Sequence, residues 1–477
     1  MNMNTTYNPR NILILIPNYV RDLEGHALVG YHLERSFGHK VHYCNMHEIR
    51  SSLLQYTVDA VILDYLAAGG RVRAARLAKE HGAKVVLLPT AGFYQSKADE
   101  LRRVGSYADL DRILDCVLSW GESFRSVLVS ESPIAAEKVH VVGCPRFDLY
   151  SKPYISSVVE PRVSFLARLG IHNHAAPIIV WTTNTYFTEA RDQKSLMHIP
   201  EVKAEFENSR EVYQNLSQLV VELARRHVDW NFVIKIHPSE VPDPYRDLPA
   251  QLPNIFVAAD VSIRDVLYHS DVLVQRWSTT ATEAWMLGKP VIEFARGAYH
   301  GSAKPEYLKG NHVVDSIEEA DLALRAYASG MGIPVEQQLA RAAFIRETYF
   351  KTDGQASKRC AEKIHELLSL PGYSDEDQAR TRRSLLEART QWLKAEERRF
   401  ANRVKRLVGL SREDSLRAWL KRFWSNSNDG ANPLPWDERI SPFMIRDAYS
   451  NYDRFLRAPA REPMPTPKRV ISGPKVA

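Results

Sequence analysis

The sequence predicts an α/β protein in which two doubly wound, Rossmann-like domains face a cleft, followed by a helical, basic C-terminal extension. Short apolar runs alternate with helical patterns from residue 11 to about residue 150, and the same alternation restarts near residue 176. The chain has 477 residues, whereas a single core stops growing at roughly 250–300 residues. We therefore expect two consecutive domains of the same architecture.

The first domain is predicted to span residues 11–170, after a polar segment, 1–10, that we expect to be disordered. Strands are predicted where short apolar runs stand between turn signals, in residues 11–17, 39–45, 58–65, 83–90, 112–121 and 138–148. Helices are predicted over 26–38 and 71–82, where apolar residues recur at helical spacing. This alternation is typical of a parallel sheet with helices on both faces.

The second domain is predicted to span residues 171–372, behind a linking segment at 151–175 that has few strand signals. Its predicted strands are residues 176–184, 230–240, 254–259, 271–277 and 289–295. Its predicted helices are residues 210–227, 262–270 and 279–288. Ligands of such domains bind beyond the carboxyl ends of the strands, so the residues that follow each strand are the first candidates for a site.

Residues 373–477 form the predicted extension, which ends in a Pro-rich and loose tail. Within it, residues 380–424 hold 14 Lys and Arg against 5 Asp and Glu, a local net charge of +9 that leaves the rest of the chain at −3. Apolar residues at helical spacing predict that an aromatic face either lies on an anionic membrane surface or packs against the two domains. Basicity confined to one segment, without a platform of stacking aromatics, argues against a nucleic-acid partner.

The overall composition excludes several other classes. The chain is 44% hydrophobic and 25% charged, as in ordinary soluble proteins. Its four cysteines lack C-x-x-C spacing and predict neither a zinc site nor a disulfide framework. The apolar run before Pro17 is shorter than the roughly 7–15 residues of a secretory signal, and no window approaches the roughly 18 apolar residues of a spanning helix. We expect a cytoplasmic protein, with a peripheral position on the inner face of the cytoplasmic membrane as the alternative.

The segment "VIKIHPSE" predicts a strand that ends in a histidine. Pro238 stops further strand pairing, so His237 lies at the carboxyl edge of the sheet, where its imidazole can donate to a phosphate oxygen. Lys235 and Glu240 are candidate contacts beside it. The alternative is a histidine that only closes the strand with a backbone hydrogen bond.

Four hydroxyl side chains follow the predicted strand 271–277: Ser278, Thr279, Thr280 and Thr282. The exposed N–H groups and the dipole of a helix N-terminus favour an anion there. Thr280 and Glu283 also fit a capping box, which accounts for these two residues but not for Ser278 and Thr279. We therefore predict a phosphate site that coexists with a helix cap.

The segment "NYVRDLEGHA" follows the first strand and brings charged residues to the predicted cleft. A carboxylate there, Asp22 or Glu24, could act as a general base, with Arg21 as a candidate contact. The alternative is a solvated first turn of a helix, where acidic residues favour the dipole. In "VVGCPRFD", Arg146 and Asp148 either reach the cleft or form ion pairs that fix the linker.

Together, "RDLEG", "GCPRFD", "KIHPSE" and "QRWSTTATEAWMLGKPVIEF" resemble the bacterial surface carbohydrate biosynthesis proteins, which look like GT-B glycosyltransferases. The likeness covers roughly residues 11–365. The His-Pro and Ser-Thr combination is also similar to CMP-sugar-dependent sialyltransferases and Kdo transferases, which implies that His237, Ser278 and Thr279 hold the donor phosphate. "EAWMLGKP" resembles the helix of GT-B proteins and UDP-sugar 2-epimerases whose glutamate holds the donor ribose, which implies this role for Glu283.

The resemblance implies a metal-independent glycosyltransferase without a cofactor. It would move a sugar from a nucleotide-sugar donor, such as CMP-Kdo, to a glycan or lipid-linked glycan of the bacterial surface. The predicted catalytic residues are Asp22, Glu24 and His237. The predicted donor-binding residues are His237, Pro238, Ser278, Thr279, Thr280 and Glu283. Candidate substrate or hinge contacts are Arg21, Arg146, Lys235, Glu240 and Gln275.

Three alternatives remain open at this point. The first is a transferase of a polyol phosphate from a CDP-linked donor, and the second is a UDP-sugar 2-epimerase, which needs no acceptor. The third is a non-catalytic scaffold that recruits glycan enzymes through residues 380–424.

Overall fold

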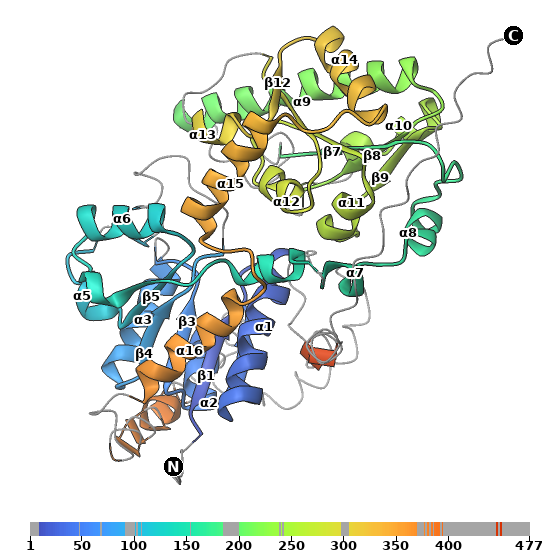
Figure 1. Ribbon diagram of the computed structural model, residues 1–477. Coiled ribbons are helices and arrows are strands. Elements are labelled where there is room, and N and C mark those ends of the chain that lie inside the picture. The colour runs from blue at the N-terminus through green and yellow to red at the C-terminus, as the bar shows by residue number, and fades with distance from the viewer. Residues whose placement is uncertain are drawn as a thin grey trace, which may run out of the picture.

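The computed structural model forms two parallel sheets, each covered by helices on its faces (Figure 1). It describes residues 9–369 with gaps, the longest being 91–100, 185–199 and 297–304, and a few residues within 376–394 and 445–450. Each sheet has six strands in this part of the chain. The predicted class, two doubly wound Rossmann-like domains, is confirmed.

The first sheet has the strand order β2-β1-β3-β4-β5-β6. Its strands are β1 (Asn11–Leu15), β2 (Lys40–Cys44), β3 (Ala60–Leu63), β4 (Lys84–Leu87), β5 (Cys116–Ser119) and β6 (Val139–Val141). The helices between them are α1 (Tyr19–Phe37), α2 (Ile49–Tyr56), α3 (Gly69–Glu80), α5 (Leu110–Ile113) and α6 (Glu122–Glu131), with the 3-10 turn η1 (Ala136–Lys138) before β6. The register pairs Ile14 of β1 with Ile62 of β3, so the loops after these strands meet at one edge.

The second sheet has the strand order β12-β11-β10-β7-β8-β9. Its strands are β7 (Ile178–Thr182), β8 (Asn231–Lys235), β9 (Ile255–Ala258), β10 (Val272–Gln275), β11 (Val291–Phe294) and β12 (His312–Val314). Its helices are α9 (Pro200–Arg226), α10 (Leu248–Gln251), α11 (Ile263–His269), α12 (Thr280–Met286), α13 (Pro305–Leu308), α14 (Ile317–Ala328) and α15 (Val335–Tyr349), with η4 (Asp243–Tyr245) after β8. The chain runs outward from β7 to β9 and then returns to β10 on the other side of β7. The strand order therefore reverses between β7 and β10, the point at which such sheets bind ligands.

The linker that has few strand signals is helical. It contains α7 (Ile155–Val158) and α8 (Arg162–Leu169), and the 3-10 helix η2 (Pro145–Tyr150) precedes it, where the sequence predicted the end of the strand 138–148. Helix α1 also differs from its predicted range, because it begins at Tyr19 rather than at residue 26. The Asn18 side chain caps it by accepting a hydrogen bond from the Arg21 backbone N–H at 3.1 Å. The charged residues of "RDLEG" consequently lie in the first two turns of α1.

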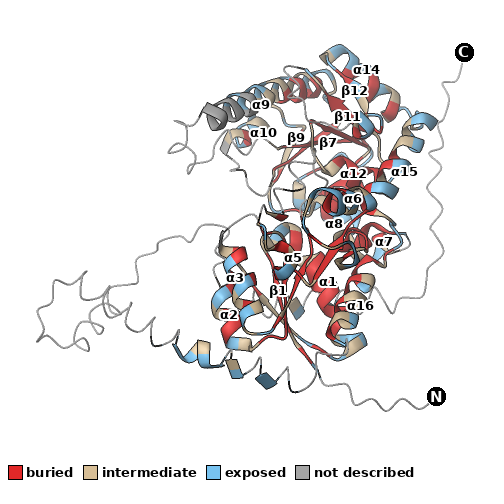
Figure 2. Ribbon diagram, turned by 90° about the vertical axis from the view of Figure 1, so that its left-hand side faces the viewer, coloured by how far each residue is buried: buried red, intermediate tan, exposed pale blue. Residues whose placement is uncertain are grey.

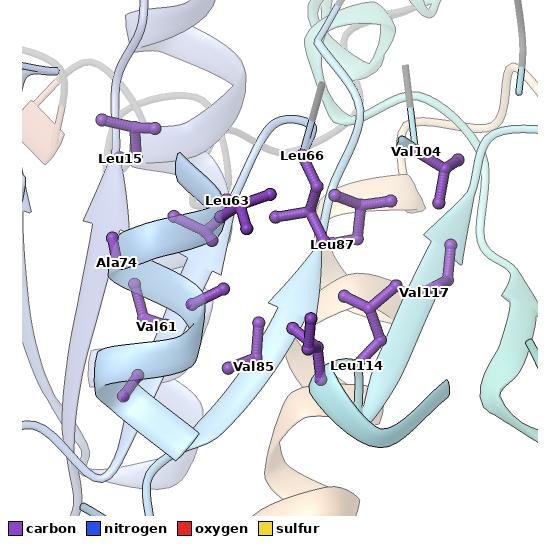
Figure 3. Close-up of a cluster of buried hydrophobic side chains, with 14 of the residues drawn as sticks. Leu15, Val61, Leu63, Leu66, Ala74, Val85, Leu87, Val104, Leu114 and Val117 are labelled. Atoms are coloured by element: carbon purple, nitrogen blue, oxygen red, sulfur yellow. The ribbon is translucent and has the colours of Figure 1, made fainter. Parts of the chain in front are cut away.

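Apolar side chains fill both faces of both sheets, and buried residues follow the strands through the centre of each domain (Figure 2). On one face of the first sheet, Leu63, Leu87 and Val117 pack together beneath α3 (Figure 3). Such near-continuous apolar strands are expected when helices cover a parallel sheet on both sides.

The last helix of the second half, α16 (Ala356–Leu368), returns to the first domain and lies beside α1 (Figure 1). Its residues Cys360, Ile364 and Leu368 complete the core on the other face of the first sheet. Asp148 caps this helix by accepting hydrogen bonds from the backbone N–H groups of Ala356 and Ser357 at 2.9 and 2.7 Å. Burial raises the pKa of Asp148 to about 6 even though these bonds favour its charged form.

Part of the C-terminal extension also contacts the first domain. Ile445 and Tyr449, in the tail that was expected to be loose, pack against Tyr31 of α1. The Tyr449 hydroxyl lies 2.9 Å from that of Tyr43. Most of the basic segment 380–424 lies outside the described residues, and its membrane contact stays a prediction. No helix of the described residues is long and apolar enough to cross a membrane.

The packing of η2 on α1 depends on a residue without a side chain. A Cβ atom on Gly25 would lie 2.9 Å from the Arg146 backbone N and 3.0 Å from its Cα. An alanine in an open helix gains about 1 kcal/mol over glycine, but here overpacking against backbone costs about 1–3 kcal/mol. We predict that Gly25→Ala lowers the free energy of unfolding, measured by urea denaturation.

Gly332→Ala is the matched control for this prediction, because nothing lies within 4 Å of its Cβ position. Its midpoint in urea should stay close to that of the parent chain. If the Gly25→Ala variant had the same urea midpoint as the Gly332→Ala variant, η2 could move to accommodate the added methyl group. That result would contradict the close packing of α1 against η2.

Candidate functional site

The candidate site lies where the carboxyl ends of β7, β8 and β10 face the first turns of α1 and the helix η2. We call it the interdomain site and define it by Arg21, Asp22, Arg146, His237, Ser278 and Glu283. Contacts between the halves fix its two walls. Arg146 lies 3.5 Å from the Glu283 carboxylate, and the positive charge of Arg21 is close enough to His237 to affect its titration.

His237 follows β8, as the sequence predicts. Its backbone N–H donates to the Thr183 hydroxyl, which follows β7, at 2.9 Å. Burial, and then the positive charges of Arg21 and Lys235, lower the pKa of His237 to about 4. The imidazole is therefore neutral near pH 7 and has one N–H to donate.

The neighbours of His237 support the strand end and do not point toward the other domain. The buried Lys235 ammonium donates to the carbonyl oxygens of Ile236 at 2.8 Å and Ala259 at 3.2 Å, and burial lowers its pKa to about 8. Glu240 accepts a hydrogen bond from the Tyr245 hydroxyl at 2.8 Å. Pro238 lies outside the described residues.

The Ser278 loop joins β10 to α12. Trp277 has a φ of +52°, which is uncommon outside glycine. Its backbone N–H donates to Glu293 at 2.7 Å, and the Asn184 amide donates to the carbonyl oxygens of Arg276 and Trp277 at 2.6 and 3.2 Å. Partners that follow β7 and lie on β11 thus hold the loop in this conformation.

The predicted capping box is wrong. The helix cap is Thr279, whose side chain makes no capping bond. The Ser278 hydroxyl instead donates to the Thr280 hydroxyl at 2.9 Å and accepts from the Thr280 backbone N–H at 3.3 Å. Glu283 does not reach back to the cap, because both of its oxygens are engaged by residues of the first half.

Gln275 is fully buried beneath the loop rather than exposed to a ligand. Its amide donates to Glu293 at 2.8 Å and to the Tyr307 hydroxyl at 2.5 Å, and Tyr307 in turn donates to the Ser278 carbonyl at 2.7 Å. Burial raises the pKa of Glu293 to about 7. This network fixes the height of the Ser278 loop above the sheet.

The first half supplies an arginine and a carboxylate that bind each other. Arg21 Nε and Nη2 donate to the two Asp22 oxygens at 2.6 and 2.8 Å, and Nη2 also lies 3.4 Å from the Thr90 hydroxyl. The Asp22 side chain is 1% exposed, whereas that of Arg21 is 38% exposed. Asp22 is therefore not the solvated residue of an ordinary first helical turn.

Two further carboxylates tie the halves together. Glu24 of α1 accepts two hydrogen bonds from Arg264 of α11, at 2.7 and 2.9 Å. Glu283 of α12 accepts a hydrogen bond from the Tyr150 hydroxyl and faces Arg146, both from η2. A contact between Glu283 and a donor ribose stays a prediction and would need one of these partners to move.

Sequence reasoning missed Tyr150, Arg264, Thr183 and Asn184. The two residues after β7 obey the same rule that singled out His237, so their place after an apolar run could have identified them. Tyr150 and Arg264 carry no local signal, because each acquires its role from a carboxylate in the other half. In the described part of the chain, no group of three or more His, Cys, Asp or Glu residues could hold a metal ion.

No protein-family model and no curated protein matches the chain. Solved structures do match. UDP-GlcNAc 2-epimerase from Neisseria meningitidis, bound to UDP-GlcNAc, superposes with a TM-score of 0.52 at 16% identity, over 75% of this chain and 100% of that one. The S. aureus MnaA–UDP structure gives 0.52 at 13% identity, over 76% and 98%.

The wall teichoic acid polymerase TagF, in a variant soaked with CDPG, is also similar. Its TM-score is 0.50 at 12% identity, over 76% of this chain and 90% of that one. Identities this low establish the fold alone. The two six-stranded sheets and the returning α16 form a GT-B fold, as the sequence resemblance implied.

The bond between the halves can be tested with a shape-conserving change. Glu283→Gln keeps an acceptor for Tyr150 but leaves the guanidinium of Arg146 without its adjacent negative charge. Breaking such a buried pair should cost roughly 3 kcal/mol of unfolding free energy, measured in urea. Tyr150→Phe is the matched control, since removal of one hydrogen-bond donor costs about 1–3 kcal/mol. An equal or smaller cost for Glu283→Gln would contradict the importance of the ion pair.

The pKa of His237 predicts how stability depends on pH. It is 6.5 ordinarily and about 4 in the fold, so between these values the unfolded chain binds more protons. Stability therefore falls as pH drops through this window. His237→Asn should make the loss between pH 6.5 and about 4 less steep, measured as urea midpoints across pH. The exposed His172→Asn serves as the control and should follow the parent curve.

Proposed function

We propose that the chain is a glycosyltransferase that moves a sugar from a nucleotide-sugar donor to a bacterial cell-surface glycan, with a CMP-sugar such as CMP-Kdo as the donor. The observation that carries the proposal is that two sets of polar residues, one from each half of the chain, face each other across the interdomain site. His237 and the Ser278 loop lie at the ligand edge of one sheet, and the Arg21–Asp22 pair faces them from the other half.

The second half binds the donor phosphate in this proposal. The neutral His237 imidazole donates one N–H and Thr279 adds a hydroxyl donor, while the Ser278 hydroxyl turns from Thr280 to the ligand. The loops that carry these groups are already held in place by Thr183, Glu293 and Asn184. Fixed donors stabilise the charge that develops on the leaving phosphate without reorganisation during the reaction.

The first half supplies the base. Of the two predicted carboxylates, Glu24 is held in a two-bond ion pair by Arg264, whose side chain is only 7% exposed. Asp22 is paired with the more exposed Arg21, which has room to move. We therefore assign the base to Asp22. It takes the proton of an acceptor hydroxyl, the oxygen bonds to the anomeric carbon, and the donor phosphate leaves with the electrons of the broken C–O bond.

The test begins with the nucleotide. Thermal unfolding is measured with CMP, CDP, UDP and GDP, since a ligand present at 100 times its Kd adds about 2.7 kcal/mol of stability. We expect CMP to raise the melting temperature most. Transfer is then assayed with donors of that nucleotide and a glycan acceptor. His237→Ala should lower kcat by about 10²-fold or more, whereas His172→Ala should not.

Each rival gives a different result. Product from CDP-glycerol but not from nucleotide sugars would establish a polyol phosphate transferase. Conversion of a UDP-sugar without acceptor would establish an epimerase. If His237→Ala left the surface glycan intact while deletion of 380–424 abolished it, the chain would be a scaffold. Any of these outcomes would replace the proposed reaction.

A further inference from the structure

The ion pair between Arg21 and Asp22 has an unusual geometry for a helix. Consecutive residues on a helix point in different directions and do not face each other. Arg21 nevertheless donates to both oxygens of Asp22, so its side chain folds back across the first turn of α1. Because Asp22 is 1% exposed and Arg21 is 38% exposed, the guanidinium is the outer member of the pair. Arg21 covers the carboxylate that the proposed function needs as its base.

The surroundings of this pair are electropositive. Arg21 acts on His237 across the interface, and the charge of Arg146 reaches both Arg21 and Asp22. Arg146 adds an independent observation. Its Nε and Nη2 atoms are buried and have no hydrogen-bond acceptor among the described residues, although Nη2 lies 3.5 Å from Glu283. Buried N–H groups without acceptors are rare in folded proteins and mark places where a ligand oxygen can bind.

An anion that enters beside His237 would therefore lie within the field of Arg21, whose charge acts on that histidine. Arginine binds phosphate oxygens in the same two-bond geometry that it uses for carboxylates. Arg21 can satisfy only one such partner at a time with its Nε and Nη2 atoms. A phosphate that takes these two N–H groups displaces Asp22, whereas one that binds only the outer Nη1 side leaves the pair intact.

We propose that the donor phosphate draws Arg21 away from Asp22, so that Asp22 becomes a free base only when the donor is bound. The inference rests on the proposed function, because it assigns the order in which that site works. Arg21 is a donor ligand in the bound state and a cover for the base in the empty state. The donor must then bind before the acceptor can be deprotonated.

The exchange can be observed without any sugar transfer. A carbodiimide with an amine labels protonated carboxyl groups, and peptide mass spectrometry locates the label. Arg21 covers both oxygens of Asp22 and is the more exposed member of the pair, so its departure should expose the carboxylate and raise the labelling of Asp22 several-fold. We expect this rise when CMP or inorganic phosphate is added to the full chain.

The charged and titratable groups around Asp22 are Arg21, Arg146, His26 and Asp64. A second ion pair in the same domain, away from these groups, provides the control. The Lys79 ammonium donates to both oxygens of Asp115 at 2.8 Å. Labelling of Asp115 should not respond to CMP or to phosphate.

Two variants separate the roles of the arginine. In Arg21→Gln, Asp22 should be labelled without any anion, and the Kd of CMP should rise about tenfold or more, because a charged hydrogen bond to the phosphate is lost. In Lys79→Gln, labelling of Asp115 should rise, while labelling of Asp22 and the affinity for CMP should stay at parent values.

The exchange is overturned if CMP and phosphate leave the labelling of Asp22 unchanged, or if Arg21→Gln weakens CMP binding without exposing Asp22. These failures differ from failure of the proposed function. Anion-dependent labelling without transfer from any donor would leave the exchange standing and remove the glycosyltransferase. Transfer from a CMP-sugar, together with labelling of Asp22 that does not depend on the anion, would leave the glycosyltransferase standing and remove the exchange.

Discussion

The rest of the structure depends on one buried carboxylate whose partners belong to the other half of the chain. Glu283 lies on α12, and it is met by Arg146 and the Tyr150 hydroxyl of η2. A buried ion costs several kcal/mol unless its partners are well placed, so this contact fixes the distance between η2 and the second sheet. Gly25 then lets α1 lie directly against η2. The first turns of α1 are aimed at the end of β8 by these two contacts together.

The interdomain site is consequently a set of matched charges. Arg21 is balanced by Asp22, Arg264 by Glu24 and Arg146 by Glu283, with each pair at or beside the boundary between the halves. The Arg264–Glu24 and Arg146–Glu283 pairs join the two halves, whereas Arg21 and Asp22 lie on the same helix. In the proposed exchange, an anionic ligand takes Arg21 from Asp22 and can also meet the buried Arg146 N–H groups that have no acceptor among the described residues. Selectivity for a ligand can therefore arise from its competition with acidic side chains for an arginine, as well as from the shape of the site.

The sequence predicted the parts of the fold that depend on local patterns. Alternating apolar runs were enough for two parallel sheets, and the rule for strand ends placed His237 and Ser278 at the correct edge. The start of α1 was missed, because a single cap by Asn18 outweighed a charged stretch with little helical periodicity. The role of Glu283 was also out of reach. A capping box is a local pattern, whereas the residues that engage Glu283 lie more than a hundred positions away.

The return of α16 ties the completion of the first domain to the synthesis of the second. Cys360, Ile364 and Leu368 close one face of the first sheet, yet roughly 200 residues separate them from β6. At about 5–20 residues per second, a ribosome needs on the order of ten to forty seconds to make that stretch. During this time that apolar face of the nascent first domain is covered by α1 but lacks α16. The gap creates an interval in which a chaperone could bind, and in which a truncated chain would aggregate instead of folding as an independent unit.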